Sequence, residues 1–420
     1  MARRYFGTDG VRGIYGEDLT PDLVERVGKA ATLWAGPGRV LIGRDTRGSG
    51  PELEDALARG IVGAGGTATL GGVLPTPAVA LLAEGLGAVV SASHNPPEYN
   101  GVKLFDRDGR KLTDAQEEEI ETLFDAPPPG GGSVEHRPDA AETYLRHVLE
   151  RFGTDLSALR VAVDCANGAF SELAPRAFAE LGAEVVPVAN EPNGSNINQG
   201  CGATDLSLVS SVVRQQGLDL GVAFDGDGDR MLAVDESGES VDGDAILAIL
   251  APALDVDLVA VTQMTNMGFH RLMAERGIRV VTTPVGDRYV LEALRDLGGV
   301  LGGEQSGHII WLRDHVTGDG LAAALLLCRA LEGRSLREAA AKLVRYPQAR
   351  QDVRVRRREV PKTILDEAAR LSRELGDRGR VLVRASGTEP VVRVLAEAET
   401  ASEAGDICAR IARLVTQELG

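Results

Sequence analysis

Cysteine is scarce in this chain of 420 residues. The four cysteines, Cys165, Cys201, Cys328 and Cys408, lie far apart, and none belongs to a Cys-x-x-Cys pair. Four dispersed thiols in so long a chain exclude a disulfide framework. We therefore expect small, buried, reduced side chains, as in a cytoplasmic protein.

Long hydrophobic runs are also absent. The most apolar window, residues 245–254, contains Pro252 and is far shorter than the ~20 residues that a membrane span requires. Arg3 and Arg4 form an arginine pair near the N-terminus, but no apolar stretch follows them. The sequence therefore predicts a cytoplasmic protein that neither enters a membrane nor carries an export signal.

Positive charge is in deficit. The 45 lysines and arginines are outnumbered by 62 aspartates and glutamates, which gives a net charge of −17. A negative field repels nucleic-acid backbones and anionic lipids, so we expect neither as a partner. The same field repels phosphate esters, so a site for a phosphorylated substrate must concentrate positive charge locally.

Short β-branched runs alternate with longer amphipathic segments along the chain. This alternation predicts α/β domains with mixed or parallel sheets. The predicted strands cover residues 40–43, 87–90, 159–164, 220–224, 258–262 and 279–283. The predicted helices include residues 51–60, 174–181 and 269–276.

The length of the chain and three candidate boundaries predict four domains. The boundaries lie near the loop APPPGGGS at residues 126–133, near Pro252 and near Tyr346. The predicted domains are residues 1–152, 153–252, 253–347 and 348–420, and the last is the smallest. Each of the first three contains an apolar strand that leads into a polar or glycine-rich loop: GAVVSASHNP, GVAFDGDGDR and GGVLGGEQSGH. Loops beyond strand ends are where α/β sheets bind ligands.

The segment FDGDGDR, residues 224–230, alternates aspartate with glycine. In an extended strand the outer carboxylates would lie ~13 Å apart, so the chain must curl if Asp225, Asp227 and Asp229 are to share one ion. Glycine permits such a curl. Three carboxylates this close repel one another unless a cation is present, and oxygen ligands suit Mg²⁺.

Two other interpretations of this loop were weighed. The spacing begins like a calcium EF-hand loop, and Glu236 falls at its twelfth position. However, the sixth position is Arg230, where that loop requires glycine, and the flanking segments are predicted strands. The other alternative is a solvated acidic turn, which the strict alternation disfavours.

The segment VVSASHNPP, residues 89–97, begins as a strand and ends in a turn that its prolines stiffen. Ser93, followed by His94, is a candidate nucleophile at a strand end. Ser91 is a second candidate. Taken alone the segment favours an ordinary turn over a nucleophile, and it lacks the G-x-S-x-G elbow of hydrolases.

The segment VRASGTEP, residues 383–390, combines an arginine, hydroxyls and free backbone N–H groups around a glycine. Such a set of groups is suited to binding an anion, although the segment is also compatible with an ordinary glycine-containing turn. The candidate anion ligands are Arg384, Ser386, Gly387, Thr388 and Arg393.

The segment GGEQSGH, residues 302–308, follows another predicted strand. Glu304 and Ser306 offer an acceptor and a donor for neighbouring sugar hydroxyls. His308 is able to titrate near neutral pH, although a lone histidine is more often structural.

Taken together and in this order, these four loops resemble those of the α-D-phosphohexomutase superfamily, over essentially the whole chain. Within the superfamily, four local sequences are most similar to those of the bacterial branch that acts on glucosamine phosphates. They are residues 6–13, 224–230, 285–289 and 303–308. Relatives acting on mannose or glucose phosphates usually have Met where Gln305 stands. One departure is the glycine-rich stretch RGSGP at residues 47–51.

The resemblance implies four domains around a central cleft, the last smaller and α+β, and often a homodimer. It implies interconversion of glucosamine 6-phosphate and glucosamine 1-phosphate, toward UDP-N-acetylglucosamine, through a phosphorylated Ser93 and a 1,6-bisphosphate. That bisphosphate acts as intermediate and activator. One Mg²⁺ per chain is expected on Asp225, Asp227, Asp229 and the Ser93 phosphate.

The resemblance also implies roles for the remaining side chains. Acid–base and charge-stabilising candidates are Arg12, Lys103 and His308, although Lys103 alone would be presumed a solvated surface residue. Glu304 and Ser306 are expected to bind sugar hydroxyls, and residues 384–388 with Arg393 to hold the phosphate that is not reacting. His94 and Arg230 are expected to support the serine and metal loops.

Three rival functions remain open at this point. A phosphomannomutase or phosphoglucomutase would use the same chemistry on another sugar. A phosphosugar-binding protein would bind without turnover, although loss of activity is usually accompanied by loss of the nucleophile or the carboxylates. A phosphatase would transfer the phosphoryl group to water.

Overall fold

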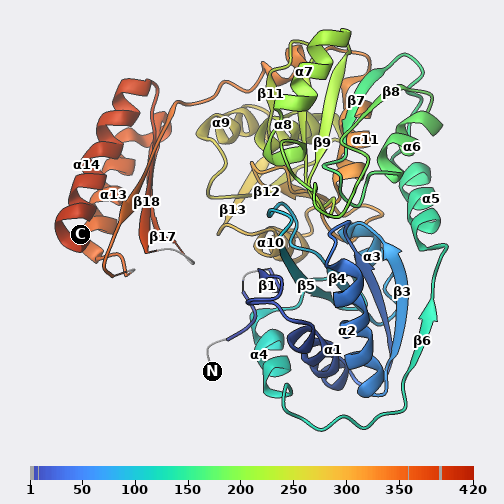
Figure 1. The fold of residues 1–420 in the computed structure, drawn as a ribbon. Helices are drawn as coiled ribbons and strands as arrows, with labels where there is room; N and C mark the ends of the chain where they lie inside the picture. Colours follow the sequence, from blue (N-terminus) through green and yellow to red (C-terminus); the bar gives the residue numbers. More distant parts are fainter. Residues whose placement is uncertain (1–3, 8, 358, 387–389) are drawn as a thin grey trace. The chain divides into compact units, whose positions relative to one another are not determined.

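The computed structural model describes residues 4–7, 9–357, 359–386 and 390–420, and Figure 1 traces the chain. The chain forms two compact units. One comprises residues 1–264 and 281–340, and the other comprises residues 265–280 and 341–420. Among the described residues, no helix is long and apolar enough to cross a membrane.

The N-terminal part of the first unit is a mixed sheet with helices. Its elements are β1 (Val11–Ile14), α1 (Pro21–Ala35), β2 (Arg39–Arg44), α2 (Gly50–Gly63), β3 (Thr67–Val73), α3 (Thr76–Leu82), β4 (Leu86–Val90), β5 (Tyr99–Phe105), α4 (Asp114–Thr122), β6 (Ser133–His136) and α5 (Ala140–Phe152). The strand order is β1-β5-β4-β2-β3-β6. Strands β2, β3, β4 and β6 run parallel, whereas β5 is antiparallel to both neighbours. Strand β4 is buried along its whole length and leads directly into the serine loop.

The second sheet has the order β11-β10-β9-β7-β8. Its elements are β7 (Arg160–Asp164), α6 (Leu173–Glu180), β8 (Glu184–Val188), the 3-10 turn η1 (Gly202–Thr204), α7 (Ser207–Gln216), β9 (Leu220–Phe224), β10 (Met231–Asp235) and β11 (Ser240–Val241). Strand β9 is parallel to β7 and antiparallel to β10. The aspartate loop is the tight connection between β9 and β10.

The third sheet has the order β13-β12-β14-β15. Its elements are α8 (Gly243–Ala253), β12 (Leu258–Thr262), α9 (Met267–Glu275), β13 (Arg279–Thr283), α10 (Asp287–Leu297), β14 (Leu301–Gly303), β15 (Ile309–Trp311), α11 (Gly320–Leu331) and α12 (Leu336–Ala340). Helix α11 begins at Asp319, whose carboxylate accepts the N–H groups of Leu321 and Ala322. Asp319 also accepts a 2.8 Å hydrogen bond from the Tyr144 hydroxyl, which joins α11 to α5.

The second unit contains an antiparallel sheet of order β16-β18-β17. Its elements are β16 (Gln348–Arg354), α13 (Lys362–Leu375), the 3-10 turn η2 (Gly376–Arg378), β17 (Arg380–Ala385), β18 (Val391–Glu397) and α14 (Ala401–Leu419). Apolar side chains of the sheet, α13 and α14 form its core.

Helix α9 belongs to this second unit although it lies between two strands of the third sheet in the sequence. The Asn266 side chain exchanges hydrogen bonds of 3.0 and 2.9 Å with the backbone of Tyr346. Arg380 donates to the Thr265 carbonyl, and the N–H of Met267 donates to Glu397 at 3.2 Å. The C-terminal unit is therefore built from two separate stretches of chain.

The predicted strands are all present, within one residue at their ends, as β2, β4, β7, β9, β12 and β13. The three predicted helices correspond to α2, α6 and α9. Each of the three loops predicted to bear ligands follows the end of a buried strand: β4, β9 or β14. The prediction of α/β units with mixed sheets is confirmed.

Candidate active site

Ser93 lies at the carboxyl end of β4 and is buried. Its hydroxyl donates a 2.5 Å hydrogen bond to Oδ2 of Asp225, and it lies 3.3 Å from Nδ1 of His94. Ser93 has a φ of +53°, a left-handed conformation that is unfavourable for a residue with a side chain. The serine loop of the first sheet thus meets the aspartate loop of the second.

Ser91, the second candidate nucleophile, lies in a different environment. Its Oγ donates to Oδ2 of Asp45 at 2.6 Å and accepts the N–H of Ser93 at 2.8 Å. Ser91 therefore ties the loop together, and Ser93 is the hydroxyl beside the carboxylates.

The aspartate loop curls as its glycines predict. Gly228 has a φ of +76°, and its N–H closes a 3.1 Å turn onto the Asp225 carbonyl. Carboxylate oxygens of Asp225, Asp227 and Asp229 lie within 4.8 Å of one another, and all three residues are buried. The backbone N–H of Arg230 donates to Oδ1 of Asp225 at 3.2 Å.

These three residues fit a metal ion. Oδ1 of Asp227 and Oδ1 of Asp229 are buried and have no hydrogen-bond partner. Burial and the neighbouring carboxylates of Asp229 and Asp227 raise the pKa of Asp225 to about 8. A cation bound by the loop would satisfy the two oxygens and relieve the repulsion, and an all-oxygen donor set suits a hard divalent ion.

Lys103, on β5, is buried rather than solvated. Its Nζ lies 2.6 Å from Oδ2 of Asp227, 3.2 Å from Oδ2 of Asp229 and 3.3 Å from Oδ2 of Asp9. Burial alone lowers the pKa of a lysine, but these carboxylates raise the pKa of Lys103 above its usual range. The lysine occupies one oxygen of Asp227 and one of Asp229 and leaves the other oxygen of each free of it.

Three further charged residues continue this cluster, and the sequence analysis assigned them no role. Lys111 pairs with Asp9 at 2.7 Å and with Asp287 at 2.6 Å. Asp9 also pairs with Arg12. Asp9 and Asp287 lie in the segments 6–13 and 285–289, which carried the resemblance, whereas Lys111 lies in none of them. Only the fold brings the three side chains together.

The sugar loop after β14 contributes His308 and Glu304. His308 is buried, with Nδ1 3.6 Å from Oδ1 of Asp229 and Nε2 3.3 Å from Oδ2 of Asp287. Burial lowers the pKa of His308, but these two carboxylates more than offset it, so the pKa lies above its usual value. Glu304 accepts the N–H of Gly286 at 3.1 Å, and Ser306 is exposed.

The three loops therefore meet within the first unit. Besides the side-chain contacts, the N–H of Met231 donates to the Gly307 carbonyl at 2.9 Å, and the N–H of Gly320 donates to the Gly228 carbonyl at 3.0 Å. The arrangement places one hydroxyl, a carboxylate triad and a set of buried cations side by side. Such a site is suited to transfer of a phosphoryl group.

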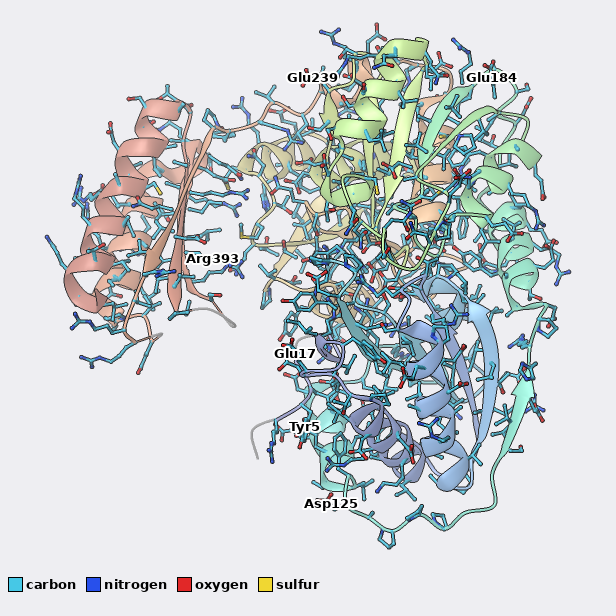
Figure 2. The ribbon with its side chains drawn as sticks, in the orientation of Figure 1. Tyr5, Glu17, Asp125, Glu184, Glu239 and Arg393 are labelled. Carbon is cyan, nitrogen blue, oxygen red and sulfur yellow. The ribbon has the colours of Figure 1, made fainter. Side chains whose placement is uncertain are left out.

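The predicted anion loop belongs to the second unit. Arg384 on β17 lies directly opposite Arg393 on β18, on the sheet face away from α13 and α14; Arg393 is labelled in Figure 2. Burial and the charge of Arg393 lower the pKa of Arg384. Like charges directly opposed across a sheet repel each other; the Asp352 carboxylate, 3.6 Å from Nε of Arg393, offsets part of this repulsion, and a bound anion would offset more. Ser386 is buried, whereas Gly387 and Thr388 lie outside the described residues.

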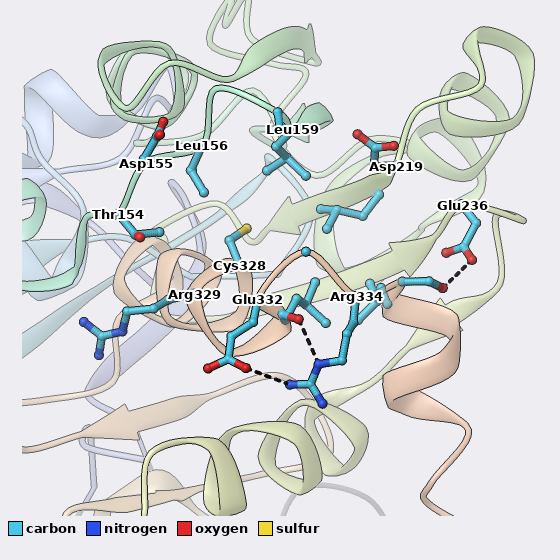
Figure 3. Close-up of a pocket in the computed structure, with 16 residues that line it drawn as sticks. Thr154, Asp155, Leu156, Leu159, Asp219, Glu236, Cys328, Arg329, Glu332 and Arg334 are labelled. Atoms are coloured by element: carbon cyan, nitrogen blue, oxygen red, sulfur yellow. Dashed lines mark hydrogen bonds and ion pairs between the residues drawn. The ribbon is translucent and has the colours of Figure 1, made fainter.

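A separate cavity of about 570 Å³ lies in the first unit beside α11 and α12 (Figure 3). Its lining includes none of the candidate site residues. Arg334 donates to the Leu331 carbonyl at 2.9 Å, and Ser335 donates to Glu236 at 2.5 Å. Its polar side chains are thus engaged with the protein itself, and the chemistry gathers at the loop cluster instead.

Family models of phosphoglucomutase/phosphomannomutase match most of this chain. The three alpha/beta/alpha domains match residues 3–128, 142–238 and 242–346 in the order I, II and III, and the C-terminal domain matches residues 337–414. The chain therefore belongs to this family of phosphohexomutase enzymes, which confirms the expected superfamily and its four-domain α/β fold.

Individual relatives narrow the comparison from the family to particular named enzymes. A phosphoglucosamine mutase of Saccharopolyspora erythraea is 47% identical, over 98% of this chain and 99% of that protein. One of Geobacillus thermodenitrificans is 44% identical, over 99% of both. Among solved structures, a phosphoglucomutase/phosphomannomutase family protein from Burkholderia thailandensis is 25% identical, with a TM-score of 0.86 over 99% of this chain and 98% of that one.

Proposed function

We propose that this enzyme interconverts glucosamine 6-phosphate and glucosamine 1-phosphate, with Ser93 as the residue that carries the phosphoryl group. The observation that carries the proposal is the position of the Ser93 hydroxyl, 2.5 Å from Asp225 in the buried aspartate triad. The choice of sugar rests on relatives that are named phosphoglucosamine mutases and match nearly the whole chain.

The reaction proceeds in two transfers. A hydroxyl oxygen of the sugar phosphate bonds to the phosphorus on Ser93 while the bond from phosphorus to Ser93 Oγ breaks, and the hydroxyl proton passes to a base. The product of this step is a 1,6-bisphosphate. In the second transfer Ser93 Oγ takes the other phosphoryl group, and the sugar oxygen that it leaves is protonated. The serine is thereby phosphorylated again.

Mg²⁺ is the proposed ion of the triad, held by Asp225, Asp227 and Asp229 with an oxygen on Ser93. When bound, it would neutralise charge on the transferred group. Oδ1 of Asp227 and Oδ1 of Asp229 are buried and accept no hydrogen bond, although Nδ1 of His308 lies 3.6 Å from the latter, and both oxygens support this assignment.

Buried cations of the chain surround the transferred group in the proposed mechanism. Arg12 and Lys103 stabilise its negative charge, and His308 moves the proton of the sugar hydroxyl. Arg230 and His94 support the aspartate and serine loops. These roles rest on position: Lys103 and His308 contact Asp229, and His94 contacts Ser93.

Substrate binding is assigned to two loops. Glu304 and Ser306 bind sugar hydroxyls, while Arg384 and Arg393, with Ser386, Gly387 and Thr388, hold the distal phosphate. The directly opposed Arg384 and Arg393 support an anion site, because a bound phosphate offsets the repulsion between them. A grip remote from the reacting centre orients the sugar in both transfers.

The deciding experiment is a coupled assay with Mg²⁺ and a trace of hexose 1,6-bisphosphate. Glucosamine 6-phosphate, mannose 1-phosphate and glucose 1-phosphate are compared by kcat/KM. We expect a clear preference for glucosamine 6-phosphate, and loss of turnover by at least ~10³-fold in Ser93→Ala. Ser91→Ala tests the other candidate nucleophile: it should still form phosphoserine at Ser93, at a reduced rate because it removes the hydrogen bonds that hold the loop. Turnover by Ser93→Ala near the wild-type rate would contradict the mechanism.

Three expectations from the sequence analysis remain predictions. They are the domain boundaries at residues 152, 252 and 347, the homodimer and the cytoplasmic location.

A further inference from the structure

The backbone of Ser93 is held by two side chains from different sheets. On one side Arg47 donates from Nη2 to the carbonyls of Ser93 (2.9 Å) and Asn95 (2.8 Å). On the other side Asn198 donates from Nδ2 to the same two carbonyls, at 2.9 and 3.1 Å. A carbonyl oxygen accepts two hydrogen bonds at most with good geometry, so both are saturated.

Arg47 is wholly buried and fully engaged. Its Nε donates to Asp45 at 2.8 Å, and its Nη1 donates to the carbonyls of Pro96 and Tyr99, the latter at 2.9 Å. With Nη2 on Ser93 and Asn95, every N–H of the guanidinium has an acceptor. Only arginine offers five donors in one plane, so lysine cannot replace it here.

Asn198 approaches from the loop between β8 and η1 of the second sheet. It has a φ of +59°, and its own N–H donates to the Ala166 carbonyl at 2.9 Å. This hydrogen bond fixes the main chain of Asn198, while Oδ1 of its side chain is buried and accepts no hydrogen bond. The same sheet supplies Asp225, so one domain provides both the acceptor of the Ser93 hydroxyl and a grip on its main chain.

We propose that Arg47 and Asn198 are positioning residues that hold Ser93 for phosphoryl transfer, an inference that rests on the proposed function. A left-handed φ is unfavourable for a residue with a side chain and persists only where the surroundings impose it. The two donors grip the main chain and leave Oγ free. The serine therefore presents its oxygen in one place in both transfers, whether or not it carries phosphate.

The first test replaces Asn198 with Ala and with Asp. Asn193 is the matched control, since it is exposed in the same loop and its side chain accepts hydrogen bonds from the N–H and the hydroxyl of Ser195, while its own N–H donates to Oδ1 of Asn196. Two readouts are used: kcat and KM for glucosamine 6-phosphate, and the rate at which Ser93 gains phosphate from glucose 1,6-bisphosphate, followed by intact mass.

We expect kcat and the phosphorylation rate of Asn198→Ala to fall together by ~10- to 100-fold, with KM within about twofold. Asn198→Asp should lower kcat and the phosphorylation rate more than Asn198→Ala does, because the new carboxylate faces two carbonyl oxygens and repels them. If only the size of the side chain mattered, Asp would resemble Asn and Ala would be worse. Asn193→Ala should behave as wild type.

Arg47→Lys is the second variant, with the folded fraction measured by circular dichroism. The variant should fold, and its kcat should fall while its KM stays close to that of the wild type. Wild-type phosphorylation rates in folded Asn198→Ala and Arg47→Lys would overturn the positioning role alone. A wild-type enzyme that gains no phosphate on Ser93 would overturn the proposed function, and the positioning role with it.

Discussion

Buried charges in the first unit are matched one by one. Lys103 contacts three carboxylates and Lys111 contacts two. Removing one partner of a buried pair costs several kcal/mol, because the other charge is left without compensation. The six side chains, Lys103, Lys111, Asp9, Asp227, Asp229 and Asp287, therefore act as one unit, and substitutions within them should not be additive.

His270 of the second unit is the opposite case. Its Nε2 is buried without a hydrogen-bond partner, and burial together with the charge of Arg380 lowers its pKa to about 4. Between pH 6.5 and 4 the unfolded chain binds a proton here that the folded chain does not. Folding stability must therefore decrease as the pH falls through this window.

We predict that His270→Leu flattens this dependence. The wild type should lose about 1–2 kcal/mol more than the variant between pH 7 and pH 4.5, after allowance for partial exposure of the ring. The measurement is chemical denaturation at each pH. His136, which is exposed, is the control position. Parallel pH profiles for wild type and His270→Leu would exclude His270 as the titrating group.

The serine and aspartate loops pack against each other through a glycine. A Cβ on Gly226 would lie 2.7 Å from the Ser93 carbonyl oxygen and 2.9 Å from Nδ2 of Asn198. We predict that Gly226→Ala lowers kcat by ~10-fold or more, because it pushes apart the two elements that face the transferred group. Steady-state kinetics on the folded variant provides the measurement.

Gly405, inside helix α14, is the contrasting control. No atom lies within 4 Å of its added Cβ, so Gly405→Ala should stabilise the chain by about 0.5–1 kcal/mol and leave kcat unchanged. A fall in kcat for both glycine variants would mean that the effect at Gly226 is not specific to these loops.

The sequence predicts those parts of the site whose functional residues are close together in the chain. Asp225, Asp227 and Asp229 lie within five residues, and Ser93 follows an apolar run, so pattern alone located both loops. Lys111 and Asn198 stand alone in the sequence, and Asp9 and Asp287 lie in segments that indicate the family but not the role of either carboxylate. Only pairing between distant strands and loops shows what these side chains contact. Arg47 was noticed as part of an unusual stretch, but its burial depends on the β4–β5 turn and cannot be inferred from neighbouring residues.

For the whole molecule we predict a dependence on divalent metal. An ion that binds only the folded chain stabilises it by RT ln(1 + [L]/Kd), about 2.7 kcal/mol at 100 times Kd. Adding Mg²⁺ to chelator-treated protein should raise Tm, and Asp225→Asn should reduce the shift. Differential scanning calorimetry across a Mg²⁺ series measures it. An unchanged Tm at millimolar Mg²⁺ would contradict metal binding by the triad.

The net charge of −17 also bears on the whole chain. The expected local concentration of positive charge is found in the second unit as Arg384 and Arg393, on facing strands. The first unit buries its cations among carboxylates instead. An anionic substrate is therefore attracted at short range by specific groups rather than by the overall field, which is screened beyond about 8 Å at physiological salt.

The discontinuous C-terminal unit has a consequence for synthesis on the ribosome. Helix α9 emerges from the ribosome early, yet its partners Tyr346, Arg380 and Glu397 are translated later. The nascent chain must hold this segment undocked until nearly all of the protein has left the exit tunnel. A ribosome that stalls before residue 397 therefore leaves the start of α9 without the hydrogen bonds of Glu397, and such an incompletely docked segment is a feature that chaperones encounter during synthesis.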